Sequence, residues 1–170
     1  MDYCFLFSFT PSYFVPAEYE TKLSQELDKI MPDLVQDDMS EYEKVCAIYN
    51  YICDNVTYVS DDRLNDDADL LKYTAYEALI NHQAVCQGYA ALLYRMLLKA
   101  GIDCRVIAGK GTGIPHAWNI VKLYGLWYNL DATWDAGEEP SAYQYFLRGS
   151  GFFDDHIRDN EYLSPAFTAD

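Results

Sequence analysis

The chain has 170 residues, of which 51% are apolar and 23% are charged. This length and composition are typical of one globular domain with a substantial core, and they exclude a disordered chain. Twenty-seven Asp and Glu against 12 Lys and Arg give a net charge of -15 and a pI near 4.3. Such an acidic chain repels phosphate backbones and anionic lipid surfaces, so we expect no nucleic acid partner and no membrane insertion.

The N-terminal segment, residues 1–16, is aromatic and bounded by proline, which predicts an extended arm or edge strand. Its short apolar run lacks basic residues and is interrupted by Ser8, so we do not interpret it as a signal peptide. No run of about 18 apolar residues is present that would span a membrane. The sequence leaves the localisation open, and a piece of a longer exported protein is compatible with it.

Three helices are expected before the middle of the chain. Apolar residues at helical spacing predict the first helix over 17–31, which Pro32 stops or kinks. Ser40 and Glu43 form a capping-box pattern at the start of a second helix over 40–54. A third helix is expected over 69–81, after an Asp-rich loop at 60–69, where we expect part of the negative charge. The rest of the acidic charge is expected on the helical side of the molecule.

The segment from Cys86 to Ala100 differs from these helices because it is apolar on nearly every side, and Gly101 ends it. A helix without a polar face lies at the centre of a fold. After Gly101 the apolar period changes to two, which predicts strands over 104–108, 116–123 and 126–131. Gly109, Gly111 and Gly113 are interpreted as a flexible loop, Tyr124-Gly125 as a hairpin turn, and residues 138–170 as a mixed tail.

The five cysteines do not form a disulfide or zinc pattern. Their number is odd, their spacing is loose and no Cys-x-x-Cys occurs, so we expect neither a disulfide framework, nor a metal, nor an organic cofactor. Four of them are interpreted as buried, inert thiols: Cys4, Cys46, Cys53 and Cys104.

Cys86 is the exception because it begins the central helix. The positive end of a helix dipole and the free N–H groups there favour a thiolate, and a thiolate nucleophile needs a histidine to carry a proton. If Tyr124-Gly125 is a two-residue turn, paired residue numbers in the hairpin sum to 249. His116 and Asp131 then lie diagonally on one face, within reach of each other.

These three segments resemble the transglutaminase-like superfamily, a papain-like cysteine fold with a Cys-His-Asp triad. The likeness rests on Val85-Cys86-Gln87-Gly88-Tyr89-Ala90, on His116 and Asp131, and on their spacings of 30 and 15 residues. It is best over about 43–148 and is strongest to bacterial transglutaminase-core domains. It implies that Cys86 is the nucleophile, His116 the general acid and base, and Asp131 the orienting carboxylate. Tyr145-Phe146-Leu147 and His156 also resemble this group, in a structural role.

Other polar residues are given structural roles. His82 and His156 have no evident partner residue in the sequence, so both are interpreted as structural. Asp135 is interpreted as a loop cap before Gly137. The Cys86 backbone N–H is expected to form half of an oxyanion hole, and Gln83 and Tyr58 are candidates for the other half.

We therefore expect an α+β domain over 1–170, with an arm and helix at 1–40, a catalytic core at 41–150 and a tail at 151–170. A central Cys-bearing helix packs on an antiparallel β-sheet. The expected function is thioester acyl transfer on a peptide or a Gln or Asn amide of a protein substrate. The alternatives are a cysteine peptidase, deamidase or amidase on the same triad, and an inactive protein-binding module.

Overall fold

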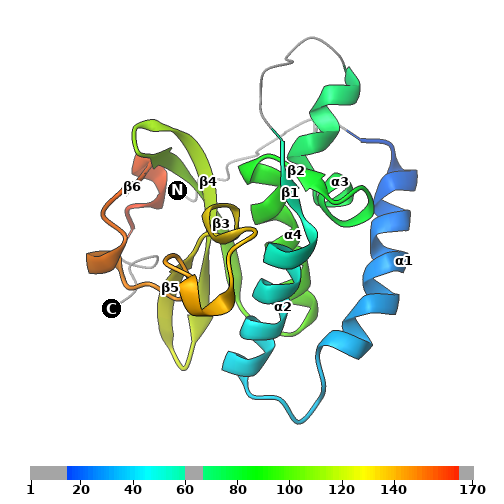
Figure 1. Ribbon diagram of the computed structural model, residues 1–170, viewed down its shortest axis with the longest axis horizontal. Coiled ribbons are helices and arrows are strands. Elements are labelled where there is room, and N and C mark those ends of the chain that lie inside the picture. The colour runs from blue at the N-terminus through cyan, green and yellow to red at the C-terminus, as the bar shows by residue number, and fades with distance from the viewer. Residues whose placement is uncertain (1–14, 60–66, 165–170) are drawn as a thin grey trace, which may run out of the picture.

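The computed structural model describes residues 15–59 and 67–164. The main sheet forms one layer and the helices form the other, with α4 next to the sheet and α1 at the far side (Figure 1). The helices are α1 (Ala17–Leu34), α2 (Glu41–Asn55), α3 (Ala75–Ile80), α4 (Cys86–Lys99) and α5 (Ala132–Asp135). The strands are β1 (Thr57–Tyr58), β2 (Gln83–Ala84), β3 (Cys104–Gly111), β4 (Ile114–Leu123), β5 (Leu126–Leu130) and β6 (His156–Arg158). The expected α+β class is confirmed.

The central position of α4 is confirmed. It packs against α2, α3, β3 and β4, and most of its apolar side chains are buried. The Tyr89 hydroxyl donates a 2.6 Å hydrogen bond to the carbonyl of Val56, which follows α2. On the sheet side, the buried Asn119 amide donates to the Ala90 carbonyl at 3.0 Å. Because buried polar groups need hydrogen-bond partners, these two bonds fix the position of α4 between the other elements.

The helix boundaries differ from expectation in two places. α1 continues through Pro32 to Leu34, because a proline removes a single backbone N–H and the Val35 N–H still donates to the Met31 carbonyl. The expected helix over 69–81 is divided into a 3-10 helix at Asp67–Tyr73 and α3. The division lies at Thr74, whose hydroxyl accepts the Glu77 N–H and caps α3. The capping box of Ser40 and Glu43 at α2 is confirmed.

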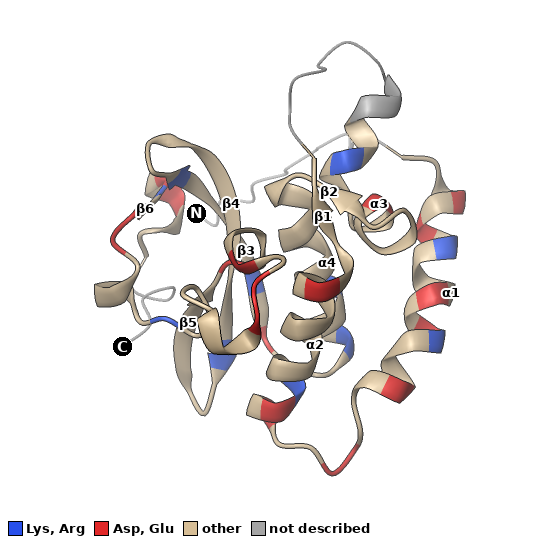
Figure 2. Ribbon diagram, in the orientation of Figure 1, with Lys and Arg blue, Asp and Glu red and all other residues tan. Residues whose placement is uncertain are grey.

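Two sequence expectations lie wholly or partly outside the described residues. They are the N-terminal arm, residues 1–14, and the Asp-rich loop, residues 60–66. Within the described ranges, no helix is long and apolar enough to span a bilayer. Asp and Glu residues occur along α1, as expected for the helical side, but also in the tail segment 154–161 (Figure 2).

The main sheet has the strand order β5-β4-β3-β6. The β4–β5 register is the expected one, with Leu123 opposite Leu126 and Asn119 opposite Leu130. The turn residues Tyr124 and Gly125 have φ of 52° and 90°, the geometry of a type I′ hairpin turn. β5 ends at Leu130, and Asp131 is the N-cap of α5 instead of a strand residue.

The glycine segment after Ala108 is not a loop. Gly109 and Gly111 belong to β3, and only Thr112 and Gly113 form the turn to β4. A Cβ on Gly109 would lie 2.1 Å from the Ile157 carbonyl oxygen of β6, and one on Gly111 would lie 2.7 Å from the Trp134 ring. Glycine is therefore needed here for close packing between strands and rings, not for flexibility.

Strand β4 contributes side chains to two cores. Val121 and Leu123 pack with the helices, whereas Trp118 and Ile120 pack with Phe153 of the tail. His116 has the same parity as Trp118, so it lies on the tail side of the sheet.

Candidate active site

Cys86 is the first residue of α4 and is partly exposed. The chain reaches it through β2, which pairs with β1, and through Val85, whose N–H donates to the Lys72 carbonyl. A Cβ on Gly88 would lie 2.6 Å from the same Lys72 oxygen, so the first turn of α4 packs directly on this backbone. The start of the helix is thereby held in one place.

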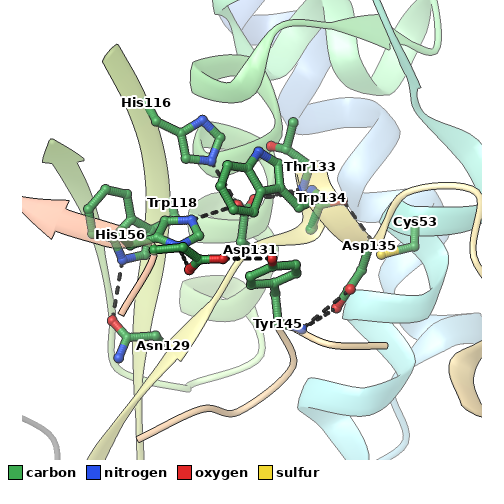
Figure 3. A network of polar contacts seen from close by, with 12 residues as sticks. Cys53, His116, Trp118, Asn129, Asp131, Thr133, Trp134, Asp135, Tyr145 and His156 are labelled. Atoms are coloured by element: carbon green, nitrogen blue, oxygen red, sulfur yellow. Dashed lines mark hydrogen bonds and ion pairs between the residues drawn. The ribbon is translucent and has the colours of Figure 1, made fainter. Parts of the chain in front are cut away.

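His116 joins Asp131 and Cys86. Its Nε2 lies 2.7 Å from Asp131 Oδ2, and its ring stacks with Trp134 at a centroid distance of 5.1 Å (Figure 3). The Cys86 side chain is a hydrogen-bond partner of the imidazole. Because Nε2 faces the carboxylate, Nδ1 is left for the thiol.

The charge state of His116 follows from these neighbours. Burial disfavours the imidazolium, but hydrogen bonds and charges from Asp131 and Cys86 outweigh burial and raise the pKa of His116 to about 9. The site therefore favours a protonated histidine at neutral pH.

Asp131 is held from both sides. Its Oδ1 accepts the N–H groups of Thr133 at 3.0 Å and Trp134 at 3.4 Å, which caps α5. Its Oδ2 accepts from His116 and from His156 at 3.0 Å. The side chain is 1% exposed, and burial alone would raise its pKa, but the two imidazoles lower the pKa below its ordinary value. Asp131 is thus an ionised, fully bonded carboxylate.

The contact between His156 and Asp131 corrects the expectation that His156 lacks a partner. His156 lies in β6, which pairs with β3 beside Gly109 and Gly111. Its Nδ1 lies 2.7 Å from Asp155 Oδ1. Sequence reasoning missed this because a three-residue strand far along the chain has no clear periodicity, and only the Asp155-His156 pair hints at a polar site.

Asp135 was expected in a loop before Gly137. The structure instead places it as the last residue of α5. It is buried, accepts the Tyr49 hydroxyl at 2.8 Å, and accepts backbone N–H groups from Gln144 and Tyr145. It therefore does cap a loop, the one at 143–146. Burial raises its pKa despite these bonds.

Two of the remaining cysteines match the inert interpretation. Cys53 and Cys104 are buried, and burial raises the pKa of each to about 12. Cys46 is partly exposed, which differs from the expected buried position. The partial burial of its thiol raises its pKa. Cys4 lies outside the described residues. In the part of the chain that the structure describes, Cys86 is the cysteine next to an imidazole.

The two oxyanion candidates lie on neighbouring strands, Tyr58 on β1 and Gln83 on β2, which leads to Cys86. Thr57 pairs with Gln83, and Tyr58 pairs with Ala84, in the parallel β1–β2 ladder. Gln83 is exposed and Tyr58 is 50% exposed, so both reach the surface beside the α4 N-terminus. Their role in binding an oxyanion is a prediction.

One group of side chains has the composition of a metal site. The ligand atoms of His116, Asp131 and His156 lie within 4.8 Å of one another. The same atoms are already joined by hydrogen bonds to Asp131 Oδ2, and a metal ion would have to replace those protons. In the structure, these three side chains are thus joined by hydrogen bonds.

The sequence profile of the transglutaminase-like superfamily matches residues 28–132, which include Cys86, His116 and Asp131. The chain belongs to this superfamily. Relatives of this chain include the kyphoscoliosis peptidases of Homo sapiens and Mus musculus, which are 31% and 32% identical over 157 residues. The match covers 79% of this chain but 23% of each relative, so the chain spans less than a quarter of their length.

Solved structures share the transglutaminase-like fold. A structure described as a TGase superposes with a TM-score of 0.59 at 23% identity, over 70% of this chain and 34% of the other. A candidate cysteine protease from Cytophaga hutchinsonii superposes with a TM-score of 0.57 at 20% identity, over 85% of this chain and 46% of the other. The resemblance and the fold expected from the sequence are both confirmed.

Proposed function

We propose that this chain is a cysteine-dependent acyl-transfer enzyme in which Cys86 is the nucleophile. The observation that carries the proposal is the His116 imidazole, which binds Asp131 through Nε2 and interacts with the Cys86 thiol. A nucleophile, a base in contact with it, and a third group that orients the base are the parts that covalent catalysis needs. An inactive binding module would not require all three in contact.

The proposed reaction begins with a carbonyl of a peptide bond or a side-chain amide. The Cys86 thiolate attacks the carbonyl carbon, an S–C bond forms, and the carbonyl electron pair moves onto the oxygen. The Val85 N-cap makes no side-chain cap bond, so the first N–H groups of α4 stay available to that oxyanion. His116 Nδ1 then protonates the amine, the C–N bond breaks, and a thioester remains.

The second half of the reaction decides the enzyme class. His116 removes a proton from water, giving hydrolysis, or from an amine, giving transfer. We favour hydrolysis of peptide bonds, because the relatives that share 31% identity are named peptidases. Transfer to an amine is the second candidate, supported by membership of the transglutaminase-like superfamily.

Casein incubated with monodansylcadaverine tests both halves at once. Hydrolysis yields casein fragments, and transfer yields fluorescent casein. We expect fragments with the wild-type chain and with Cys104→Ser, but not with Cys86→Ser. Fluorescent casein without fragments would favour the transferase. If the wild-type chain yields neither product and Cys86 is no more reactive toward iodoacetamide than Cys46, the proposal is wrong.

A further inference from the structure

A second imidazole–carboxylate pair lies directly behind the proposed triad. The His156 side chain is 0% exposed and lies between two carboxylates. Its Nε2 is 3.0 Å from Asp131 Oδ2, and its Nδ1 is 2.7 Å from Asp155 Oδ1. The polar contacts therefore run without a break from His116 through Asp131 and His156 to Asp155 (Figure 3 shows the part around Asp131).

Both ring nitrogens of His156 face a carboxylate oxygen. A neutral imidazole carries one N–H, and an ionised carboxylate carries none, so two short bonds to two carboxylates require both ring nitrogens to be protonated. Asp131 already accepts two backbone N–H groups and His116. Asp155 also accepts the Tyr145 hydroxyl through Oδ2 at 2.8 Å. Both carboxylates are thus surrounded by donors, which favours their ionised forms.

The surroundings of His156 strengthen these bonds. Its ring stacks on Phe153 at a centroid distance of 3.9 Å and lies 4.4 Å from the Trp134 ring. The titratable groups that face it are Asp131 from α5, His116 from β4, Asp155 from its own segment and Tyr145 from the loop before it. The aromatic walls exclude water from the ring and from Asp131, so a charge-assisted bond between these two is stronger than one at the surface, whereas the Asp155 side chain is 33% exposed.

We propose that His156 is a positioning residue: as an imidazolium clamped between Asp131 and Asp155, it fixes the carboxylate that orients His116. This inference rests on the proposed function. The positive charge on His156 also offsets the negative charge of Asp131, so the site can hold the Cys86 thiolate without accumulating unbalanced negative charge. His156 does not touch the reacting atoms in this scheme and acts through Asp131.

The direction of a pH shift separates this role from a merely structural one. In Asp155→Asn the second counter-charge is lost, and we expect His156 to become neutral, with Nε2–H still bonded to Asp131. A positive charge next to Asp131 then disappears, so the pH midpoint at which iodoacetamide alkylates Cys86 should rise by about half a unit. If His156 were neutral in the wild-type chain, the same substitution would only remove a negative charge, and the midpoint would fall.

Two further variants complete the design. His156→Gln can keep one N–H bond to Asp131 but removes the charge while Asp155 stays, so its midpoint should rise more than that of Asp155→Asn. Asp154→Asn is the matched control, because Asp154 is the exposed neighbour of Asp155 and loses the same formal charge. Its midpoint should stay unchanged or fall slightly. If His156→Gln fails to fold, the comparison of Asp155→Asn with Asp154→Asn still decides the sign.

Nitrogen-15 NMR of the histidine rings gives a readout independent of activity. At one and the same pH, we expect both nitrogens of His156 to carry a proton in the wild-type chain, and one of them in Asp155→Asn. A neutral wild-type His156, or equal shifts in Asp155→Asn and Asp154→Asn, would overturn the inference while leaving a reactive Cys86 and the proposed function intact. An unreactive Cys86 in the wild-type chain would instead overturn the proposed function, and with it the catalytic purpose of the clamp.

Discussion

Asp131 has two carboxylate oxygens with different tasks. Oδ1 accepts the backbone N–H groups that begin α5, and Oδ2 accepts from His116 and His156. One residue therefore couples the start of a helix to the orientation of an imidazole. Because each oxygen faces only donors, an isosteric side chain with one donor end cannot satisfy both sides.

Asp131→Asn exploits this asymmetry. The amide NH₂ must face either the α5 backbone, which removes a cap that contributes about 1 kcal/mol, or the imidazoles, which selects the wrong tautomer of His116. We expect turnover of casein to fall by about 10²–10⁴-fold, by analogy with serine triads. Asp135→Asn is the comparison, because Asp135 binds Tyr49 and the loop backbone. It should lower the thermal midpoint and largely keep turnover; a larger loss of turnover in Asp135→Asn would mean that the orienting carboxylate is misassigned.

Cys86→Ser separates chemistry from packing. The substitution changes little volume at a partly exposed helix start, so the fold should survive, but a hydroxyl there is a far weaker nucleophile. We expect turnover to fall by at least about 10³-fold with the thermal midpoint nearly unchanged. Cys104→Ser places a hydroxyl in a buried site and should cost about 1–2 kcal/mol of stability with little change in turnover. The reverse pattern would assign the nucleophile to the wrong cysteine.

At the level of elements, the short strand β6 closes the site from the tail side. It pairs with the last three residues of β3, and its first residue, His156, faces Asp131. The pairing is possible because Gly109 brings the two backbones together without a side chain. The sheet that carries His116 and the tail are therefore coupled through a backbone contact.

Gly109→Ala tests this coupling. The new Cβ would meet the Ile157 carbonyl at 2.1 Å, a backbone atom that cannot rotate away, so β6 must shift. We expect a loss of about 1–3 kcal/mol of unfolding free energy, measured by denaturant titration, and a lower rate of Cys86 alkylation as His156 leaves Asp131. Gly149→Ala is the control, because a Cβ there meets nothing within 4 Å. Equal effects of the two substitutions would argue against a role of β6 in the site.

At the level of the whole molecule, charge is distributed so that the buried carboxylates have partners. Figure 2 shows acidic residues along α1 and in the tail, and most of them are exposed. In the network around His156, the buried Asp131 and the partly exposed Asp155 share two imidazoles. A net charge of -15 therefore coexists with a locally balanced site.

The pH dependence follows from His116. Its pKa is raised from 6.5 to about 9 in the folded chain, so its contribution to stability is complete below the unfolded value and is lost as the pH rises through about 9. We expect turnover to lose its proton donor over the same alkaline range. Thermal midpoints and casein turnover measured against pH check both effects. His116→Gln should abolish turnover and remove the alkaline loss of stability; if the loss persists in this variant, another group causes it.

The elements with local signals were predictable from the sequence alone. The Ser40 capping box, the apolar α4 and the two-residue turn at Tyr124-Gly125 each depend on neighbours within a few residues. The alternation of side chains along the strands, together with the turn, then predicted that His116 lies near Asp131, because the register of a hairpin is the same along its whole length.

Contacts between distant segments were decided only by the tertiary structure. Gly109 and Gly111, which the sequence predicted in a loop, belong to β3. They lie there because β6 and the Trp134 ring pack directly against their backbone. His156 reached Asp131 by a strand pairing that spans more than forty residues, and Asp135 found Tyr49 on α2. Such contacts leave no periodic pattern, since loop closure brings the segments together only once the core has formed. The sequence therefore determined the hairpin and the helix that begins with Cys86, whereas packing of the tail decided which groups stand behind them.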